Sequence, residues 1–151
     1  MNEEPSVSVA TSADDAAIAA AINAIRGVDG AAASGFDHDW SHGEAGAWRD
    51  TQEKGGGGVL VARIGGGLAG FGALEPVGEG VASLGVWVSP GHRRKGLGTV
   101  LARALLDTGR ERGFRRIRGK MLESETALSF LGSIGALVPL VNPEMEFELP
   151  L

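Results

Sequence analysis

Three basic side chains stand immediately before two closely spaced glycines, where a strand pattern changes to a helix pattern. Arg93, Arg94 and Lys95 precede Gly96 and Gly98. The first N–H groups of a helix have no partners within it, and the helix dipole makes that end positive. Glycines let an anion approach these groups closely, and arginine binds phosphate through paired hydrogen bonds. The segment therefore predicts a site for a phosphate-bearing ligand. The alternative is a helix start with solvated charges.

Residue types that are absent exclude several reactions. The chain of 151 residues contains no cysteine and no tyrosine, so disulfides, thiolate metal sites and a cysteine acyl-enzyme are excluded. His38 and His42 are four residues apart, but a zinc site needs further ligands. We therefore expect no metal site and interpret them as polar loop residues. The four glycines of 55–58 lack the Gly-Lys-Ser/Thr ending of a nucleotide-binding loop and are interpreted as a connector.

Charge is distributed unevenly along the chain, whose net charge is −5. Residues 93–120 contain ten of the fourteen Lys and Arg and two acids, a charge of +8, and the remainder carries −13. A basic segment on an acidic body indicates a polyanionic ligand bound at one place. The acidic remainder would repel a long polyanion. A small phosphate-bearing cofactor is therefore expected rather than nucleic acid.

Hydrophobic periodicity predicts a mixed α/β (α+β) domain. Strands are expected at 6–10, 59–64, 68–74, 82–88, 116–122, 137–141 and 145–149. Helices are expected at 12–26, 44–53, 96–112 and from Ser124 to about residue 134. The central sheet would have six to seven strands flanked by about four helices. The βαβ unit over 82–122 predicts parallel strands on either side of the third helix. Neither a repeat nor a domain boundary is visible, so a single domain is expected over 1–151.

No signal sequence and no run of eighteen apolar residues occurs in the chain. We therefore expect a cytoplasmic protein with no membrane partner.

Three segments resemble a known family. Arg93-x-x-Gly96-x-Gly98 is similar to the Arg/Gln-x-x-Gly-x-Gly/Ala motif of the GNAT superfamily of N-acetyltransferases. Segment 85–90 resembles the strand leading into that motif, and 70–72 resembles the Gly-Phe signature of the third strand. The element order matches from about residue 7 to 149. Ala10-Thr11, Ile22-Asn23 and Trp48 give a fainter likeness to phosphinothricin-type amine acetyltransferases.

The resemblance implies acetyl-CoA as co-substrate, bound where the fourth and fifth strands splay apart. The pantetheine arm would lie along Val86, Trp87 and Val88, and the pyrophosphate on the amides of 94–99. The last helix, with Ser124, would flank the thiol end, and an acceptor amine would enter from the other side. The cofactor-binding residues implied are Val86, Trp87, Val88, Arg93, Arg94, Lys95, Gly96, Leu97, Gly98, Thr99 and Ser124.

Three positions depart from the family pattern. Ser124 stands where relatives often have Asn, Leu131 where many have the Tyr that protonates the thiolate, and Ser83 where many have a Glu general base. Catalysis would then rest on positioning, on water or on another side chain. Glu75, Glu79 and Ser124 are the candidate catalytic residues. The alternatives are two solvated turn carboxylates and a simple helix cap.

The leading interpretation is acetyl transfer from acetyl-CoA to a primary amine of a small molecule, by direct attack in a ternary complex. The alternatives are acetylation of a protein N-terminus or lysine, and a non-catalytic acyl-CoA-binding module. Domains of this family often pair, which leaves a homodimer open.

Overall fold

The computed structural model describes residues 5–34, 36–93, 96–120 and 146–150. Its elements, in chain order, are β1 (Ser6–Val9), the 3₁₀ helix η1 (Ser12–Asp14), α1 (Asp15–Ser34), α2 (His42–Lys54), β2 (Gly58–Ile64), β3 (Gly67–Gly78), β4 (Val81–Val88), the 3₁₀ helix η2 (Pro90–His92), α3 (Leu97–Glu111), β5 (Arg116–Lys120) and β6 (Glu146–Pro150).

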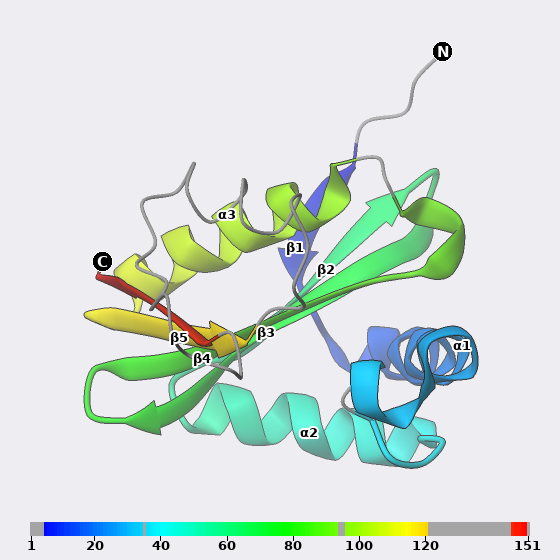
Figure 1. The fold of residues 1–151 in the computed structure, drawn as a ribbon, viewed down its shortest axis with the longest axis horizontal. Coiled ribbons are helices and arrows are strands. Elements are labelled where there is room, and N and C mark those ends of the chain that lie inside the picture. The colour runs from blue at the N-terminus through cyan, green and yellow to red at the C-terminus, as the bar shows by residue number, and fades with distance from the viewer. Residues whose placement is uncertain (1–4, 35, 94–95, 121–145, 151) are drawn as a thin grey trace.

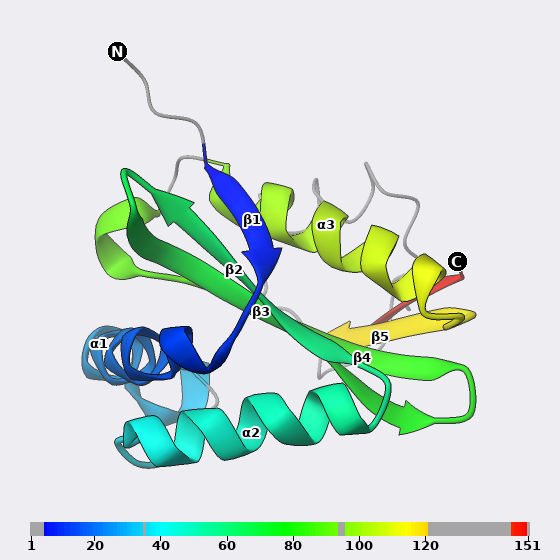
Figure 2. The ribbon, with the colours of Figure 1, turned by 180° about the vertical axis from the view of Figure 1, so that it is seen from behind.

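The described strands form one sheet in the order β1-β2-β3-β4-β5-β6. Neighbours are antiparallel except β4 and β5, which run parallel because α3 connects them. Helices α1 and α2 cover one face of the sheet and α3 covers the other (Figures 1 and 2). The predicted mixed α/β class is confirmed. The expected helix from Ser124 and strand 137–141 lie outside the described residues.

The core has two layers because side chains of the central strands alternate between the faces. The layer under α1 and α2 contains Ile18, Ile22, Val59, Val61 and Phe71. The layer under α3 contains Leu60, Leu74, Leu105, Leu106 and Ile117. Each of these side chains is at most 5% exposed, and burying one such side chain is worth about 1.5–3 kcal/mol. Strands β2 and β3, covered on both faces, are therefore the most deeply buried part of the sheet.

The 3₁₀ helix η1, which leads directly into α1, and helix α2 each begin at a capping box. Thr11 accepts from Ala13 N while Asp14 accepts from Thr11 N, and Ser41 and Glu44 make the reciprocal pair before α2. The predicted helix end at Gly27 is wrong, since α1 continues to Ser34. Its helical conformation is interrupted at Gly30, where φ is 83°, in the left-handed region that favours glycine.

Helix α3 lies close to β3 because β3 has glycine where the two meet. A Cβ on Gly72 would lie 2.5 Å from Leu105 Cδ1 and 3.0 Å from the carbonyl oxygen of Gly85. Leu105 is fully buried, so any side chain at position 72 would push the helix off the sheet. The Gly-Phe-Gly segment 70–72 therefore sets the distance between α3 and the sheet.

Candidate functional site

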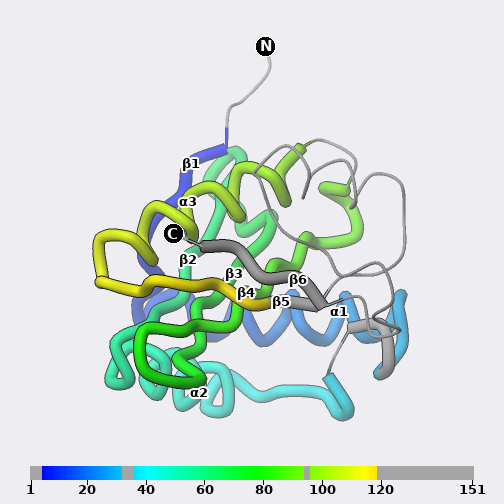
Figure 3. Tube along the Cα trace, turned by 60° about the vertical axis from the view of Figure 1, so that its left-hand side comes forward, coloured from blue at the N-terminus to red at the C-terminus, as the bar shows by residue number. Residues whose placement is uncertain are grey.

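Strands β4 and β5 pair over three residues and then part. The parallel register joins Val81 to Arg116, Ala82 to Ile117 and Ser83 to Arg118, and no pair follows. The rest of β4, Leu84–Val88, pairs only with β3 among the described strands. In the order of the sheet β5 lies between β4 and β6, and Figure 3 shows β5 running alongside β4. Because β5 leaves β4 after Ser83, it does not cover this part of β4, and a strand edge of this kind can bind an amide-bearing chain.

The N-terminus of α3 lies beside the part of β4 that β5 leaves uncovered. Its N-cap residue, Gly96, has φ 78° and ψ 7° and gives no side-chain cap, so the first N–H groups of α3 have no side-chain partner from the cap. A Cβ on Gly98 would lie 3.8 Å from Val88 Cγ2 and 3.9 Å from Val86 Cγ1. The parted strand and the positive end of the helix thus form one continuous site, as expected for a ligand with both amide and phosphate groups.

The expected pantetheine-binding residues of β4 point to both faces of the sheet. Val86 and Val88 pack against the core layers under α3. Trp87 points to the opposite face and stacks on Phe71, with ring centroids 5.1 Å apart and planes at 18°. A Cβ on Gly85 would lie 2.4 Å from Trp87 Cη2, so this glycine makes room for the indole.

Arg93 is held by an acidic residue of α1. Its Nη1 and Nη2 donate to Asp29 Oδ1 and Oδ2 at 2.8 and 2.6 Å, and its Nε donates to the carbonyl oxygen of Val88 at 3.2 Å. This pairing lowers the pKa of Asp29, chiefly through the hydrogen bond from Arg93, and raises the pKa of Arg93. Sequence reasoning identified Arg93 as a phosphate-binding cation and did not identify Asp29.

Only some of the other predicted cofactor-binding residues lie among the residues that the structure describes. Leu97 is buried in the core under α3, and Thr99 is half-buried in the first turn. Arg94, Lys95 and Ser124 lie outside the described residues, as does Leu131.

Of the candidate carboxylates, one lies in the sheet and the other in a hairpin. Glu75 of β3 is the cross-strand partner of Ser83, so both side chains lie on the face of Trp87. Glu75 is half-buried, whereas Glu79 is exposed at the turn between β3 and β4. There Glu79, Arg115 and Arg116 line a depression of about 370 Å³. That depression is at the opposite end of β4 from the start of α3.

A row of aromatic rings lines the α1/α2 side of β4. Phe36 lies 5.3 Å from Trp87 and 5.4 Å from Trp40, and Trp48 lies 5.8 Å from Trp40 and 6.1 Å from Trp87 between ring centroids. Most contacts are edge-to-face, a favourable arrangement. The segment joining α1 to α2 is thereby packed onto β4, on the side where the acceptor is expected.

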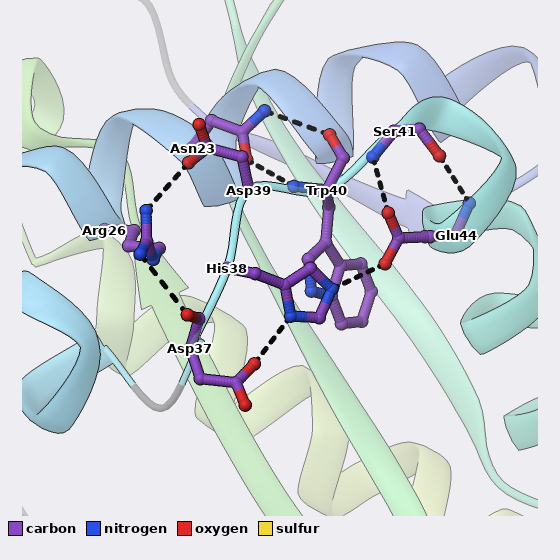
Figure 4. A network of polar contacts seen from close by, with 8 residues as sticks. All are labelled: Asn23, Arg26, Asp37, His38, Asp39, Trp40, Ser41 and Glu44. Atoms are coloured by element: carbon purple, nitrogen blue, oxygen red, sulfur yellow. Dashed lines mark hydrogen bonds and ion pairs between the residues drawn. The ribbon is translucent and has the colours of Figure 1, made fainter.

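A polar network fixes the same segment (Figure 4). Asn23 of α1 donates to the carbonyl oxygen of Trp40 at 3.0 Å and accepts from its N–H at 2.7 Å. His38 Nδ1 and Nε2 lie 2.6 Å from Asp37 Oδ1 and 2.7 Å from Glu44 Oε2. These contacts, the one to Glu44 first, raise the pKa of His38 and lower the pKa of both carboxyls.

Within the described part of the chain, no group of three His, Asp or Glu side chains is arranged to hold a metal ion. Over the same residues, none of the helices has the length and apolar character needed to cross a membrane.

The site combines two features: β5 parts from β4, and α3 begins at Gly96 beside the parted strand. This arrangement fits a class of domains that transfer acyl groups. The model of the acetyltransferase (GNAT) family matches residues 26–131. The chain belongs to this family, and the predicted resemblance is confirmed. A search of curated proteins found no match.

Solved structures share the fold at low sequence identity. The protein yncA of Salmonella typhimurium, solved with its cofactor acetyl-CoA, is 23% identical with a TM-score of 0.81, covering 97% of this chain and 94% of its own. A phosphinothricin acetyltransferase of Sinorhizobium meliloti in complex with acetyl-CoA is 18% identical, with a TM-score of 0.83 and coverage of 97% and 88%. A ribosomal-protein-alanine N-acetyltransferase of Brucella melitensis is 20% identical, with a TM-score of 0.82 and coverage of 97% and 99%.

Proposed function

We propose that this protein transfers an acetyl group from acetyl-CoA to a primary amine of a small molecule. The observation that carries the proposal is the parting of β4 from β5 beside the glycine-capped start of α3. The parted strand offers backbone groups to the amides of a pantetheine arm, and the helix end offers N–H groups to a pyrophosphate. Acetyl-CoA contains both groups, and similar structures such as yncA are complexes with it.

Two segments of the chain would bind different parts of acetyl-CoA. The backbone of Val86–Val88 would hold the pantetheine, and the N–H groups of 96–99 would hold the phosphates. With no cysteine in the chain, the amine attacks the thioester carbonyl directly in a ternary complex. The new C–N bond forms as the C–S bond breaks, CoA leaves as thiolate, and the amine loses a proton. Orienting the two reactants supplies much of the rate.

Glu75 is the best-supported acceptor of that proton among the described candidates. It is half-buried and directly opposite Ser83, the position where relatives often carry the base. Glu79 is exposed beside Arg115 and Arg116, farther along the hairpin from the parted part of β4. Ser124 stays a candidate, although it lies outside the described residues.

The acceptor side supports a compact amine with apolar character. Trp40, Trp48 and Trp87 are each half-buried, so they present apolar surface next to β4. Of the nearby carboxylates, Asp39 is paired with Arg26 and Asp37 with His38. These pairs neutralise part of the negative charge on the acceptor side, and attraction for a cationic acceptor would come mainly from Glu75.

The domain organisation, the cellular compartment and the oligomeric state are also proposed. We propose that residues 1–151 act as one domain in the cytoplasm. Light scattering of the purified protein would decide whether two copies pair.

The test is a calorimetric titration with acetyl-CoA, followed by a screen of amines for acetylated product by mass spectrometry. The panel would contain small aliphatic and aromatic amines, lysine peptides and peptides with a free N-terminus. Binding with acetylation of a small amine is expected. Acetylated peptides alone would indicate a protein acetyltransferase, and binding without any product would indicate an acyl-CoA-binding module. No binding would overturn the proposal.

A further inference from the structure

An acidic residue occupies the end of a helix where the dipole disfavours it. Asp29 is the last residue before Gly30 interrupts the helical conformation of α1. A carboxylate near a helix C-terminus faces the negative end of the dipole, a cost of about 0.3–1 kcal/mol. Asp29 therefore does not serve the stability of its own helix, and its partner lies elsewhere.

That partner is Arg93, 64 residues farther along the chain. Two parallel hydrogen bonds join the guanidinium to the carboxylate, with side chains 37% and 25% exposed. A paired arrangement of this kind is the strongest geometry for arginine and a carboxylate. The remaining contact, from Nε to the Val88 carbonyl oxygen, ties the same guanidinium to the last residue of β4.

Arg93 therefore connects three parts of the site: the end of α1, the end of β4 and the loop that leads into α3. Its three nitrogens are all engaged by Asp29 and Val88, and its positive charge is balanced by the carboxylate. A side chain held in this way is suited to fixing a loop, and less suited to following a mobile phosphate.

We propose that Asp29 is a positioning residue for acetyl-CoA binding: it holds Arg93, and through it the segment from Ser89 to Arg93 at the end of β4, beside the start of α3 whose N–H groups can receive the phosphates. The inference rests on the function proposed above. It assigns Arg93 a structural task within the motif and leaves phosphate binding to the backbone of α3 and the other basic residues.

The substitution Asp29→Asn separates this role from direct phosphate binding by Arg93, because the two roles predict opposite changes in the affinity for acetyl-CoA. If Arg93 is a phosphate ligand, removing the competing carboxylate charge frees it and acetyl-CoA binds more tightly. If Asp29 positions the loop, acetyl-CoA binds more weakly. We expect the Kd measured by calorimetry to rise about two- to fivefold, as for a partly exposed charge pair.

Exchanging the two residues provides the second arm of the test. Asp29→Arg combined with Arg93→Asp restores the ion pair but puts a carboxylate in the loop. A positioning role predicts that the exchange variant binds acetyl-CoA more tightly than Asp29→Asn alone, since the ion pair holds the segment again. A phosphate-ligand role predicts that the exchange weakens binding beyond either single change, because the loop then repels the phosphates.

Asp50→Asn is the matched control, since it breaks an exposed ion pair with Lys54 on α2, away from the loop. It should leave the Kd unchanged, and thermal unfolding of every variant would confirm that it is folded. A tighter or unchanged Kd in Asp29→Asn, with a parent that binds acetyl-CoA, would overturn the positioning role alone. A folded parent that does not bind acetyl-CoA would overturn the proposed function itself.

Discussion

Arg49 of α2 donates two hydrogen bonds to Asp15 of α1, from Nε to Oδ1 at 2.7 Å and from Nη2 to Oδ2 at 3.2 Å. Both side chains are 13% exposed. The pair joins the two helices that form the acceptor side of the sheet. It fits between them because α2 has glycine at position 46, where a Cβ would lie 2.6 Å from Asp15 Oδ2.

Gly46→Ala should therefore destabilise the protein despite raising helix propensity. The added methyl group forces Asp15 away from Arg49, and overpacking of this kind costs about 1–3 kcal/mol, against a propensity gain of at most ~1 kcal/mol. We expect a net loss of about 1–2 kcal/mol in the free energy of unfolding by urea.

Gly43→Ala in the same helix is the control, since its Cβ would meet only Ser41 Oγ, at 3.7 Å. It should leave stability unchanged or slightly raised. Equal losses in both variants would contradict the packing argument.

Gly96→Val should abolish acetyl-CoA binding. Gly96 has φ 78° and nothing within 4 Å of a built Cβ, so the cost comes from the backbone conformation, about 1–2 kcal/mol or more for a β-branched residue. If the backbone at position 96 changed conformation to relieve this strain, the first N–H groups of α3 would turn away from the phosphates. Calorimetry should show no binding in this variant.

Gly91→Ala, in the same loop and with equal free space, should bind like the parent because its φ is not in the left-handed region. Gly96→Asn should bind better than Gly96→Val, since asparagine tolerates that conformation. Retention of parental affinity by Gly96→Val would remove the helix start from the binding site.

Glu75→Gln should lower kcat by about 10²–10⁴-fold, the usual contribution of a general base, while the Kd for acetyl-CoA stays unchanged. Glu79→Gln, in the exposed turn, should leave kcat unaltered. Steady-state kinetics with the acceptor found in the amine screen would measure both. Loss of activity in Glu79→Gln and not in Glu75→Gln would exchange the two assignments.

His38 makes stability depend on pH. Its folded-state pKa is raised above the ordinary 6.5, first by the hydrogen bond with Glu44 and then by that with Asp37. A raised pKa means that the stabilisation is fully present below pH 6.5 and is lost as pH rises through the folded value. The pKa of Glu44 is lowered from 4.5, so its contribution is complete only above that pH.

The thermal midpoint of the parent should therefore exceed that of His38→Gln most between pH 4.5 and 6.5. The difference should shrink at alkaline pH, where the imidazole is neutral in both folded and unfolded chains. A difference that stays constant across this range would mean that His38 acts by packing on Trp40, whose ring lies 6.3 Å away, and not by charge.

Hydrophobic periodicity predicted those helices and strands whose bounds follow from their own pattern of apolar side chains. The meander of β2, β3 and β4 and the amphipathic α3 appear within a few residues of their expected bounds. Helix α1 is longer than expected because Gly27 adopts helical geometry and only Gly30 takes a positive φ. Sequence alone cannot tell a glycine that ends a helix from one tolerated inside it at about 1 kcal/mol.

The contacts between distant segments were beyond sequence reasoning. The phosphate-loop motif was visible in Arg93 and Gly96, but the partner of Arg93 was not, because Asp29 is far away in the chain. No signal in the sequence pointed to Asp29, since the helix expected at 12–26 ends before it. Likewise His38 was considered only with His42, whereas its contacts are Asp37 and Glu44.

The sheet lists its strands in the order of the chain, and this bears on how the protein is made. Each described strand from β2 onward can pair, as it leaves the ribosome, with the strand before it. Only β1, whose residue Ser6 pairs with Arg63 of β2, must wait for a later strand before it can join the sheet. Once a nascent chain has emerged from the ribosome as far as Val88, it contains the whole meander together with α1 and α2, and it should already protect the amides of β2 and β3 from hydrogen exchange.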